Sequence, residues 1–324
     1  MFRVIQATSG SSAVEFFGTD ALTHCAGADL CWVDLQGFDE HDLALLQQTF
    51  GFHQLAIDDC NHQGQRPKIT EYENYLFMIL HSMSFADDAK TPEFSELNIF
   101  LGDRFVVTVH REPIDAVDQV WKRVLAEPAG SSHGPDYLCY TIVDLLMDSV
   151  FPILDQLSEA LLDVENDIVG RTDGTELPRL LGLKRALVAV RRVLAAERDV
   201  LAILIRRGNP LIRERNSIYF RDCYDHLVRA YEQIDLERDL FGNAMDAYLW
   251  TTSNRLGIIM KQLTILSAIF LPPTFITSFF GQNFTALPFD SRTLFFVEVV
   301  TCISLPAIML YWFYRSGWMK SPGA

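Results

Sequence analysis

Two long hydrophobic segments near the C-terminus constrain the fold more than any other feature of this chain. The first, Leu263–Phe280, contains 18 residues without a charge, and the second, Thr293–Tyr314, contains 22 with Glu298 as the only charge. A helix rises about 1.5 Å per residue, so each segment is long enough to cross a bilayer core of roughly 30 Å. The sequence therefore predicts a membrane protein with two transmembrane helices joined by a short outer loop.

The part of the chain before these spans is expected to lie in the cytoplasm. Residues 1–10 lack the basic start and apolar run of a signal peptide. The roughly 250 residues before the first span suffice for one large soluble domain or two smaller ones. Basic residues flank both spans on one side of the membrane: Arg255, Lys261, Arg315 and Lys320. By the positive-inside rule, both termini are expected to be cytoplasmic.

Charge and cysteine content limit the partners. The formal net charge is −15, which repels nucleic-acid phosphates and attracts cations, so no nucleic-acid partner is expected. Solubility in the cytoplasm explains the same acidity equally well.

The six cysteines show no CxxC spacing, which indicates a reducing compartment and no disulfide framework. No phosphate loop, nucleophile elbow or catalytic Cys/His pair is recognisable, so an enzyme is not expected.

Residues 1–135 alternate strand and helix patterns, which predicts an α/β or α+β cytoplasmic domain. The predicted strands are Leu30–Leu35, Tyr75–Met83 and a hairpin over Asn98–Val109 that turns at Gly102 and Asp103. The predicted helices are Asp39–Phe50, capped by Asp39, and Pro113–Leu125.

Longer helical patterns follow and predict an α-helical stalk. Tyr137–Val169 predicts a helix that Pro152 kinks, and Leu177–Arg207 predicts a second helix. A third begins near Ser217 and continues unbroken into the first hydrophobic segment. The predicted division is 1–135 (α/β domain), 136–261 (stalk), 262–283 (first transmembrane helix), 284–292 (outer loop), 293–314 (second transmembrane helix) and 315–324 (cytoplasmic tail).

Two spans are too few to enclose a water-filled path, so the chain either anchors a soluble domain or joins several copies around a shared pore. The first span favours a pore, because small hydroxyl residues share one stripe with Met and Leu at heptad spacing. The stripe consists of Met260, Leu263, Ser267, Leu271, Thr274, Ser278 and Gly281. Helix packing alone is the competing explanation of this stripe. Pro272 and Pro273 free two carbonyls that need partners among protein, water or an ion, although a simple kink explains them as well.

The end of the first span offers oxygen ligands. Gly281 allows the backbone to turn, and Asn283 presents an amide oxygen and a carbonyl directly after Gln282. A ring of such oxygens binds a hydrated divalent cation through its waters, since Mg²⁺ releases water reluctantly. The tripeptide Gly-x-Asn is also common in ordinary turns.

Other metal-ligand candidates are weaker. Adjacent residues seldom chelate one ion, so Asp58–His62 is interpreted as a structural loop rather than a metal site. His81 and His110 are interpreted as hydrogen-bonded domain histidines, and His226 as part of a charged stalk face. Glu298 is either a functional acid inside the membrane or a side chain that reaches the interface.

Motifs along nearly the whole chain follow one family pattern. They are Met260–Thr264, Ile269–Pro272, Phe280–Phe284 and Arg315–Trp318 around the membrane, and Phe52–Asp59, Gln65–Lys68 and Tyr219–His226 in the soluble part. Taken together, these segments resemble the CorA family of divalent-cation channels, in which Gly-Met-Asn ends the first span. The zinc-transporting ZntB branch is a relative of that family.

The resemblance implies a funnel-shaped homopentamer in the lipid bilayer, with the first span lining the pore and the second packed outside it. Carried over by position, the pore and selectivity residues are Gly281, Gln282, Asn283, Thr274, Leu271, Leu263 and Met260. Met260 and Leu263 form the hydrophobic constriction in this scheme. The resemblance also implies acids that sense intracellular cation between subunits. Asp222 matches the stalk acid, Asp225 lies one turn away, and Asp87 follows Ala86 at the opposing position.

The implied function is transport of divalent metal cations, Mg²⁺ or Zn²⁺ and also Co²⁺ or Ni²⁺, with no cofactor besides the transported ions. Gln282 replaces the family's Met but keeps the Asn283 ligand, which leaves both magnesium and zinc open. The stripe offers no thiolate or imidazole, which argues against tight binding of dehydrated Zn²⁺. The alternative is a non-conducting, membrane-anchored metal sensor or scaffold of the same family.

Overall fold

The computed structural model of the chain describes residues 1–7, 13–25, 28–85, 92–126, 133–170, 174–206, 209–282 and 291–319. The chain divides into two compact units, Met1–Asp246 and Ala247–Ala324, and helix α7 (Ser217–Phe280) passes from one to the other. The predicted division at residue 135 falls inside the first unit. It stays a prediction about where the α/β part ends.

The first unit is built on a seven-stranded sheet with the strand order β2-β1-β3-β7-β6-β5-β4. Only β3 and β7 pair in parallel, and all other neighbours are antiparallel. The strands are β1 (Phe2–Ala7), β2 (Val14–Phe17), β3 (Leu30–Gln36), β4 (Lys68–Glu71), β5 (Tyr75–Phe85), β6 (Pro92–Gly102) and β7 (Phe105–His110). The predicted hairpin is confirmed, since Asn98 on β6 lies opposite Val109 on β7 and the chain turns between Gly102 and Phe105.

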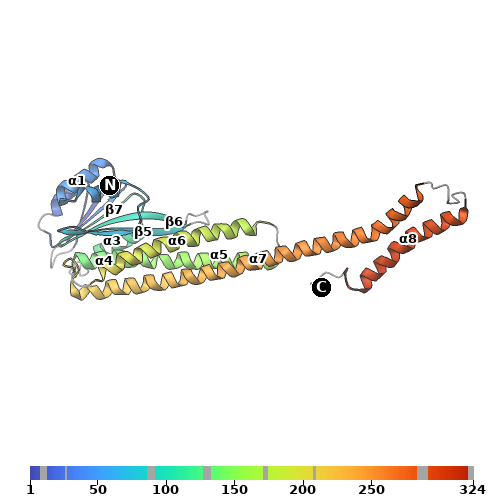
Figure 1. Cartoon of the computed structure of the whole chain (residues 1–324). Coiled ribbons are helices and arrows are strands. Elements are labelled where there is room, and N and C mark those ends of the chain that lie inside the picture. Colours follow the sequence, from blue (N-terminus) through green and yellow to red (C-terminus); the bar gives the residue numbers. More distant parts are fainter. Residues whose placement is uncertain are drawn as a thin grey trace. The chain divides into compact units, whose positions relative to one another are not determined.

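Helices lie on both sides of the sheet (Figure 1). On one side, Phe77, Ile79 and Val107 join a core under α1 (Glu40–Phe50) and α2 (Gln54–Asn61). The ring of Phe52, at the start of α2, stacks on Phe100 with centroids 4.0 Å apart. The other side of the sheet is covered by α3 (Asp115–Ala126) and the long helices that follow.

Local signals place α1 as predicted. Asp39 is its N-cap and accepts a hydrogen bond from the backbone N–H of Asp42 at 2.9 Å, while Asp42 returns the bond to Asp39. Gly51 ends the helix with φ 70°, a conformation that favours glycine. Asp58–Asn61 was expected in a loop, and this interpretation is wrong. These residues form the last turn of α2, which His53 caps by accepting from the N–H of Leu55.

The long helices pack along the sheet and along one another. They are α4 (Pro135–Asp148), α5 (Val150–Gly170), α6 (Glu176–Leu204) and α7, which follows a short 3-10 turn at Glu214–Asn216. The kink predicted at Pro152 is wrong in place, because the helix is interrupted at Ser149 instead. Pro152 lies in the first turn of α5, where its missing N–H costs no helical hydrogen bond. Within the first unit, α7 buries side chains every three or four residues: Phe220, Cys223, Leu227, Ala230, Ile234, Phe241 and Ala244.

Cys25 and Cys31 form a disulfide, which corrects the prediction that all thiols are free. The 3-10 helix Thr19–Cys25 returns the chain to the start of β3, so that the two Cα atoms lie 5.3 Å apart. Cys60, Cys139 and Cys223 are free thiols buried in the first unit, as expected from their spacing.

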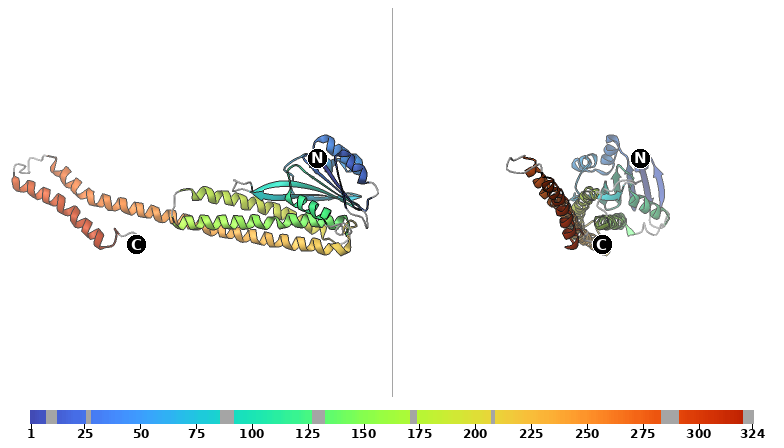
Figure 2. Two further views of the ribbon diagram at one scale, coloured as in Figure 1. Left: turned by 180° about the vertical axis from the view of Figure 1, so that it is seen from behind. Right: turned by 90° about the vertical axis from the view of Figure 1, so that its right-hand side faces the viewer.

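The second unit consists of the end of α7 and α8 (Arg292–Arg315), which folds back beside it (Figure 2). Three helical segments of the described chain are long and apolar enough to cross a membrane: Pro135–Ile168, Glu214–Phe280 and Arg292–Arg315. The apolar window of the first is 56% buried inside the protein, whereas those of the other two are 0% buried. The first segment therefore belongs to the core of the first unit, and the other two leave their apolar surface uncovered.

Candidate functional site

The predicted stripe on α7 lies on an exposed face of the second unit. Met260, Leu263 and Leu271 are 59%, 54% and 68% exposed, and the remaining stripe positions are exposed as well. The shielded side chains of the same segment are Ile265, which is buried, and the half-buried Lys261, Ala268, Ile269, Pro272, Pro273, Ile276 and Phe280. At about 100° per residue, these two sets lie roughly 180° apart on the helix. The stripe thus points away from the face that the rest of the unit shields.

Hydroxyl groups in this segment bond to the helix backbone. Thr274 Oγ1 donates to the carbonyl of Phe270 at 2.8 Å, and Thr264 Oγ1 donates to that of Met260 at 2.7 Å. Thr277 Oγ1 lies 3.1 Å from the carbonyl of Pro273, close to where two prolines interrupt the hydrogen-bond ladder. A hydroxyl that donates to its own helix keeps its oxygen lone pairs free. Thr274 can therefore present an acceptor to a water or a hydrated ion without breaking the helix.

The end of α7 is tight around Gly281. Its N–H donates to the carbonyl of Thr277 at 2.9 Å, and a Cβ at this position would stand only 3.1 Å from the same oxygen. Gln282 is exposed directly after it. Asn283, the predicted ligand, lies outside the described residues, so its role at the mouth stays a prediction.

The predicted sensor acids lie on the part of α7 that belongs to the first unit. Asp222 and Asp225 are exposed, and Asp222 faces His226 with 3.7 Å between Oδ2 and Nε2. The other ring nitrogen of His226, Nδ1, lies 3.3 Å from Asp148 on α4. Asp87, the predicted opposing acid, lies outside the described residues. Among the described residues, no three His, Cys, Asp or Glu side chains are grouped closely enough to hold a metal ion.

A further acid that was not predicted lies beneath this surface. Asp144 on α4 is half-buried, and burial together with the neighbouring Asp148 raises its pKa. Its carboxylate accepts from Cys223 Sγ at 3.5 Å and from the Tyr140 hydroxyl at 3.4 Å. Tyr140 and Asp148 lie one helical turn before and after Asp144 on α4, whereas Cys223 belongs to α7 and no spacing along the chain predicts its contact.

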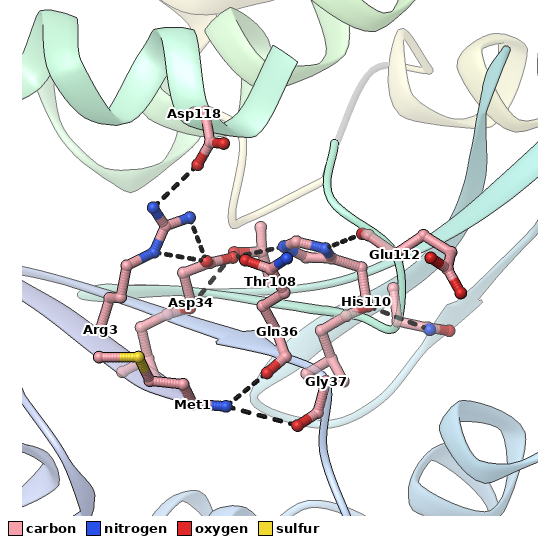
Figure 3. A network of polar contacts seen from close by, with 12 residues as sticks. Met1, Arg3, Asp34, Gln36, Gly37, Thr108, His110, Glu112 and Asp118 are labelled. Carbon is pink, nitrogen blue, oxygen red and sulfur yellow. Dashed lines mark hydrogen bonds and ion pairs between the residues drawn. The ribbon is translucent and has the colours of Figure 1, made fainter. Parts of the chain in front are cut away.

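A network of charged and polar side chains surrounds the buried Asp34 in the first unit (Figure 3). Asp34 is 0% exposed and accepts hydrogen bonds from Arg3, Thr108 and His110. Arg3 also donates to Asp118 on α3 at 2.8 Å. Burial is the largest single influence on both Asp34 and His110 and opposes their ionisation. The hydrogen bond and the charge attraction between them, with smaller contributions from their other partners, together outweigh burial, so that the pKa of Asp34 is lowered and the pKa of His110 is raised. His110 is therefore a hydrogen-bonded domain histidine, as predicted.

The other candidates from the sequence are placed as follows. Asp59 in α2 forms an ion pair with Lys68 at 2.7 Å, and no metal-binding group forms there among the described residues. Glu298 is half-buried on α8. Both interpretations of Glu298, as a functional acid inside the membrane or as a side chain that reaches the interface, stay predictions.

Comparison with known proteins extends this description. The model of the family described as CorA-like Mg²⁺ transporter protein matches residues 27–315. YfjQ of Bacillus subtilis is 34% identical over 290 residues, which cover 89% of this chain and 90% of the relative. The cobalt/magnesium transport protein CorA of Thermotoga maritima is 29% identical over 322 residues, which cover 98% of this chain and 89% of the relative.

A solved structure has the same fold. The complete structure of the CorA magnesium transporter from Methanocaldococcus jannaschii superimposes with a TM-score of 0.81 at 23% identity, covering 98% of this chain and 99% of that one. The chain therefore has the fold of that transporter.

Proposed function

Because the chain belongs to the CorA-like Mg²⁺ transporter family, we propose that it carries divalent metal cations across the bacterial inner membrane. Its two C-terminal helices span the bilayer, both termini lie in the cytoplasm, and five copies assemble around a shared pore. Each copy contributes one face of α7 to the pore, and α8 packs outside it. Transport, rather than catalysis, agrees with the relatives named above.

The exposed stripe on α7 is the observation that carries this proposal. A helix hairpin with one shielded face leaves the stripe uncovered, and lipid would cover a stripe of leucines equally well. Hydroxyl groups at Ser267, Thr274 and Ser278 distinguish the stripe from a lipid-facing surface, because a polar face is favoured toward water or protein. Around a five-fold axis these positions form rings along a narrow path.

In the proposed path, hydrated cations bind first at a ring of Asn283 and Gly281 beside Gln282. They then pass Thr274, whose oxygen accepts hydrogen bonds from the ion's water shell, and Leu271. Met260 and Leu263 form a hydrophobic neck toward the cytoplasm, where a constriction can close by dewetting. Passage with the water shell intact tolerates Mg²⁺, Co²⁺ or Zn²⁺, since no direct ligand has to match one ion.

The sensor acids are part of the same proposal. Cation bound between subunits through Asp222, Asp225 and Asp87 would stabilise the closed pore when the cytoplasmic concentration is high. The exposure of Asp222 and Asp225 supports this role, since both carboxylates are available to a neighbouring copy.

Flux through proteoliposomes tests the path. Purified protein is reconstituted with a metal-sensitive dye inside, and Mg²⁺, Zn²⁺, Co²⁺ or Ni²⁺ is added outside with and without a proton gradient. We expect Asn283→Ala to abolish uptake and Thr274→Val to reduce it at least several-fold. Thr301→Val is the matched control, because Thr301 on α8 donates to the carbonyl of Val297 at 2.7 Å just as Thr274 bonds Phe270.

Equal effects of Thr274→Val and Thr301→Val would place Thr274 outside the path. If the protein forms pentamers that pass none of the four ions, the chain is a non-conducting sensor or scaffold instead. In that case metal-dependent protection from proteolysis that requires Asp222 identifies the sensor.

A further inference from the structure

A cavity of about 410 Å³, lined by both polar and apolar side chains, lies in the first unit, far along the chain from the membrane segments. It opens between the end of α2, the paired strands β5 and β6, and the residues that follow β7. Its size falls in the range of pockets that hold small metabolites. The proposed transport path uses none of its residues.

Two nearly buried side chains in the wall have acceptor atoms without partners. Asn98 is 3% exposed, and its amide nitrogen donates to the carbonyl of Val109 at 3.2 Å, while Oδ1 has no partner. His81 is 6% exposed, and burial lowers its pKa to about 4, so its ring is neutral. One ring nitrogen bonds the backbone of Gln65, and Nδ1 has no partner. In a neutral ring whose other nitrogen donates, this Nδ1 is an acceptor.

Buried acceptor atoms without a hydrogen-bond partner destabilise the folded protein. A polar atom that is buried without a hydrogen bond has lost its bonds to water and gained none in return. Native interiors retain few of them, and two in one cavity point to a ligand that supplies donors.

Opposite charges line the same cavity without meeting. Arg111 lies over the ring of Phe38 at 4.5 Å and donates through one terminal nitrogen to Asn61, while its buried Nε has no partner. Glu96 is held by the backbone N–H groups of Gly64 and Gln65. Within the described chain, no ion pair joins Arg111 to Glu96. A cation and an anion that share a cavity but do not pair suit a ligand that carries both charges.

We propose that this cavity binds a small zwitterion of the α-amino acid class. Its carboxylate would bind the guanidinium of Arg111, including the free Nε–H, in the forked geometry that arginine favours. Its ammonium group would donate to the free acceptors of Asn98 and His81 and to the carboxylate of Glu96. A metal ion fits less well, because the described residues group no three ligands that could hold one. A simple anion would leave the acceptors of Asn98 and His81 unpaired.

Isothermal titration calorimetry on the full-length protein in detergent tests the proposal. The probes are the standard L-amino acids, added one at a time, and then the N-acetyl and carboxamide forms of any that bind. We expect saturable binding of at least one amino acid and at least tenfold weaker binding of both derivatives, since each lacks one charge. Arg111→Met and Glu96→Gln should each weaken binding at least tenfold.

Two control variants separate binding from folding. Arg123→Met on α3 and Glu93→Gln on β6 change the same residue types at exposed positions away from the cavity and should leave the affinity unchanged. Near-UV circular dichroism of every variant verifies that the first unit is folded. No binding of any amino acid, equal binding of the derivatives, or unchanged binding by folded Arg111→Met and Glu96→Gln would each overturn the proposal. Binding of inorganic phosphate or of Mg²⁺ alone at this cavity would overturn it as well.

Discussion

Replacing Asp34 by Asn tests how much the buried charge network stabilises the first unit. The carboxylate accepts from Thr108 at 2.6 Å and His110 at 3.1 Å through one oxygen, and from Arg3 at 2.6 and 3.0 Å through the other. The substitution keeps the volume but removes the charge and turns an amide N–H toward one of these donors. Removing one partner of a buried ion pair costs about 3–5 kcal/mol. Arg3 is 19% exposed and keeps Asp118 as a partner, so we expect the lower end, about 3 kcal/mol.

Thermal unfolding of the full-length protein in detergent, followed by tryptophan fluorescence, measures this effect. Trp32 donates to Thr108 at 3.1 Å, and Trp121 lies 4.7 Å from the guanidinium carbon of Arg3, so both tryptophans report on the network. A loss of about 3 kcal/mol lowers the Tm of a unit of this size by roughly 6–12 °C. Asp103→Asn, in the exposed turn between β6 and β7, is the control and should change stability by less than about 0.5 kcal/mol. Equal Tm values for the two variants would refute the stabilising role of the network.

The loss of stability caused by Asp34→Asn should also depend on pH. Since the pKa of His110 is raised in the folded state, its charge stabilises the fold fully below the ordinary imidazole pKa of about 6.5. That contribution disappears as the pH rises through the raised pKa. The difference in Tm between Asp34→Asn and the wild type should therefore shrink at alkaline pH. A difference that grows with pH would contradict a charged His110 beside Asp34.

Two further substitutions test other buried acids. Burial raises the pKa of Glu197 on α6 to about 8, although the hydrogen bond that its carboxylate accepts from the His81 N–H acts in the opposite direction. The wild type therefore loses stability as the pH rises from about 4.5 to about 8. Glu197→Gln keeps the hydrogen-bond acceptor but cannot titrate. In thermal unfolding measured at a series of pH values, the stability of this variant relative to the wild type should rise between about pH 4.5 and pH 8. A stability difference that stays constant over this range would show that Glu197 does not titrate there. The hydroxyl of Ser158 on α5 donates to the buried carboxylate of Glu237 on α7. Ser158→Ala should therefore lower the free energy of unfolding by about 1–3 kcal/mol in the same assay. Unchanged stability would show that another donor, such as water, replaces the hydroxyl.

Local signals explain which elements are predictable from the sequence. The hairpin over Asn98–Val109 and the capped helix after Asp39 follow from turn and capping residues that act within a few positions. The short strands β1 and β4 lack such signals, because they are defined by their neighbours in the sheet. The break at Ser149 escapes prediction for a similar reason: Pro152 is the conspicuous residue, but proline is tolerated in the first turn of a helix.

The functional site divides in the same way. The stripe from Met260 to Gly281 depends only on helical periodicity, so its common face is predictable, while its role in a pore stays a prediction. The contacts of His226 with Asp148 and the network around Asp34 join residues from separate elements. No residue spacing along the chain predicts these contacts. The cavity beside Arg111 cannot be predicted from the sequence either, because it forms only where β5, β6 and α2 lie together.

The single parallel pairing between β3 and β7 also sets the order of assembly during synthesis. Strands β1 to β3 and strands β4 to β7 each pair with near neighbours, but the sheet closes only when Leu30–Gln36 meets Phe105–His110. Until the ribosome has delivered His110, the apolar edge at Trp32 and Val33 has no partner, and such edges promote aggregation. Non-local pairing of this kind is slow. A defect that delays β7 should therefore produce chains that aggregate or are degraded before the membrane segments are made, and its effect in cells would appear as low abundance rather than as faulty insertion.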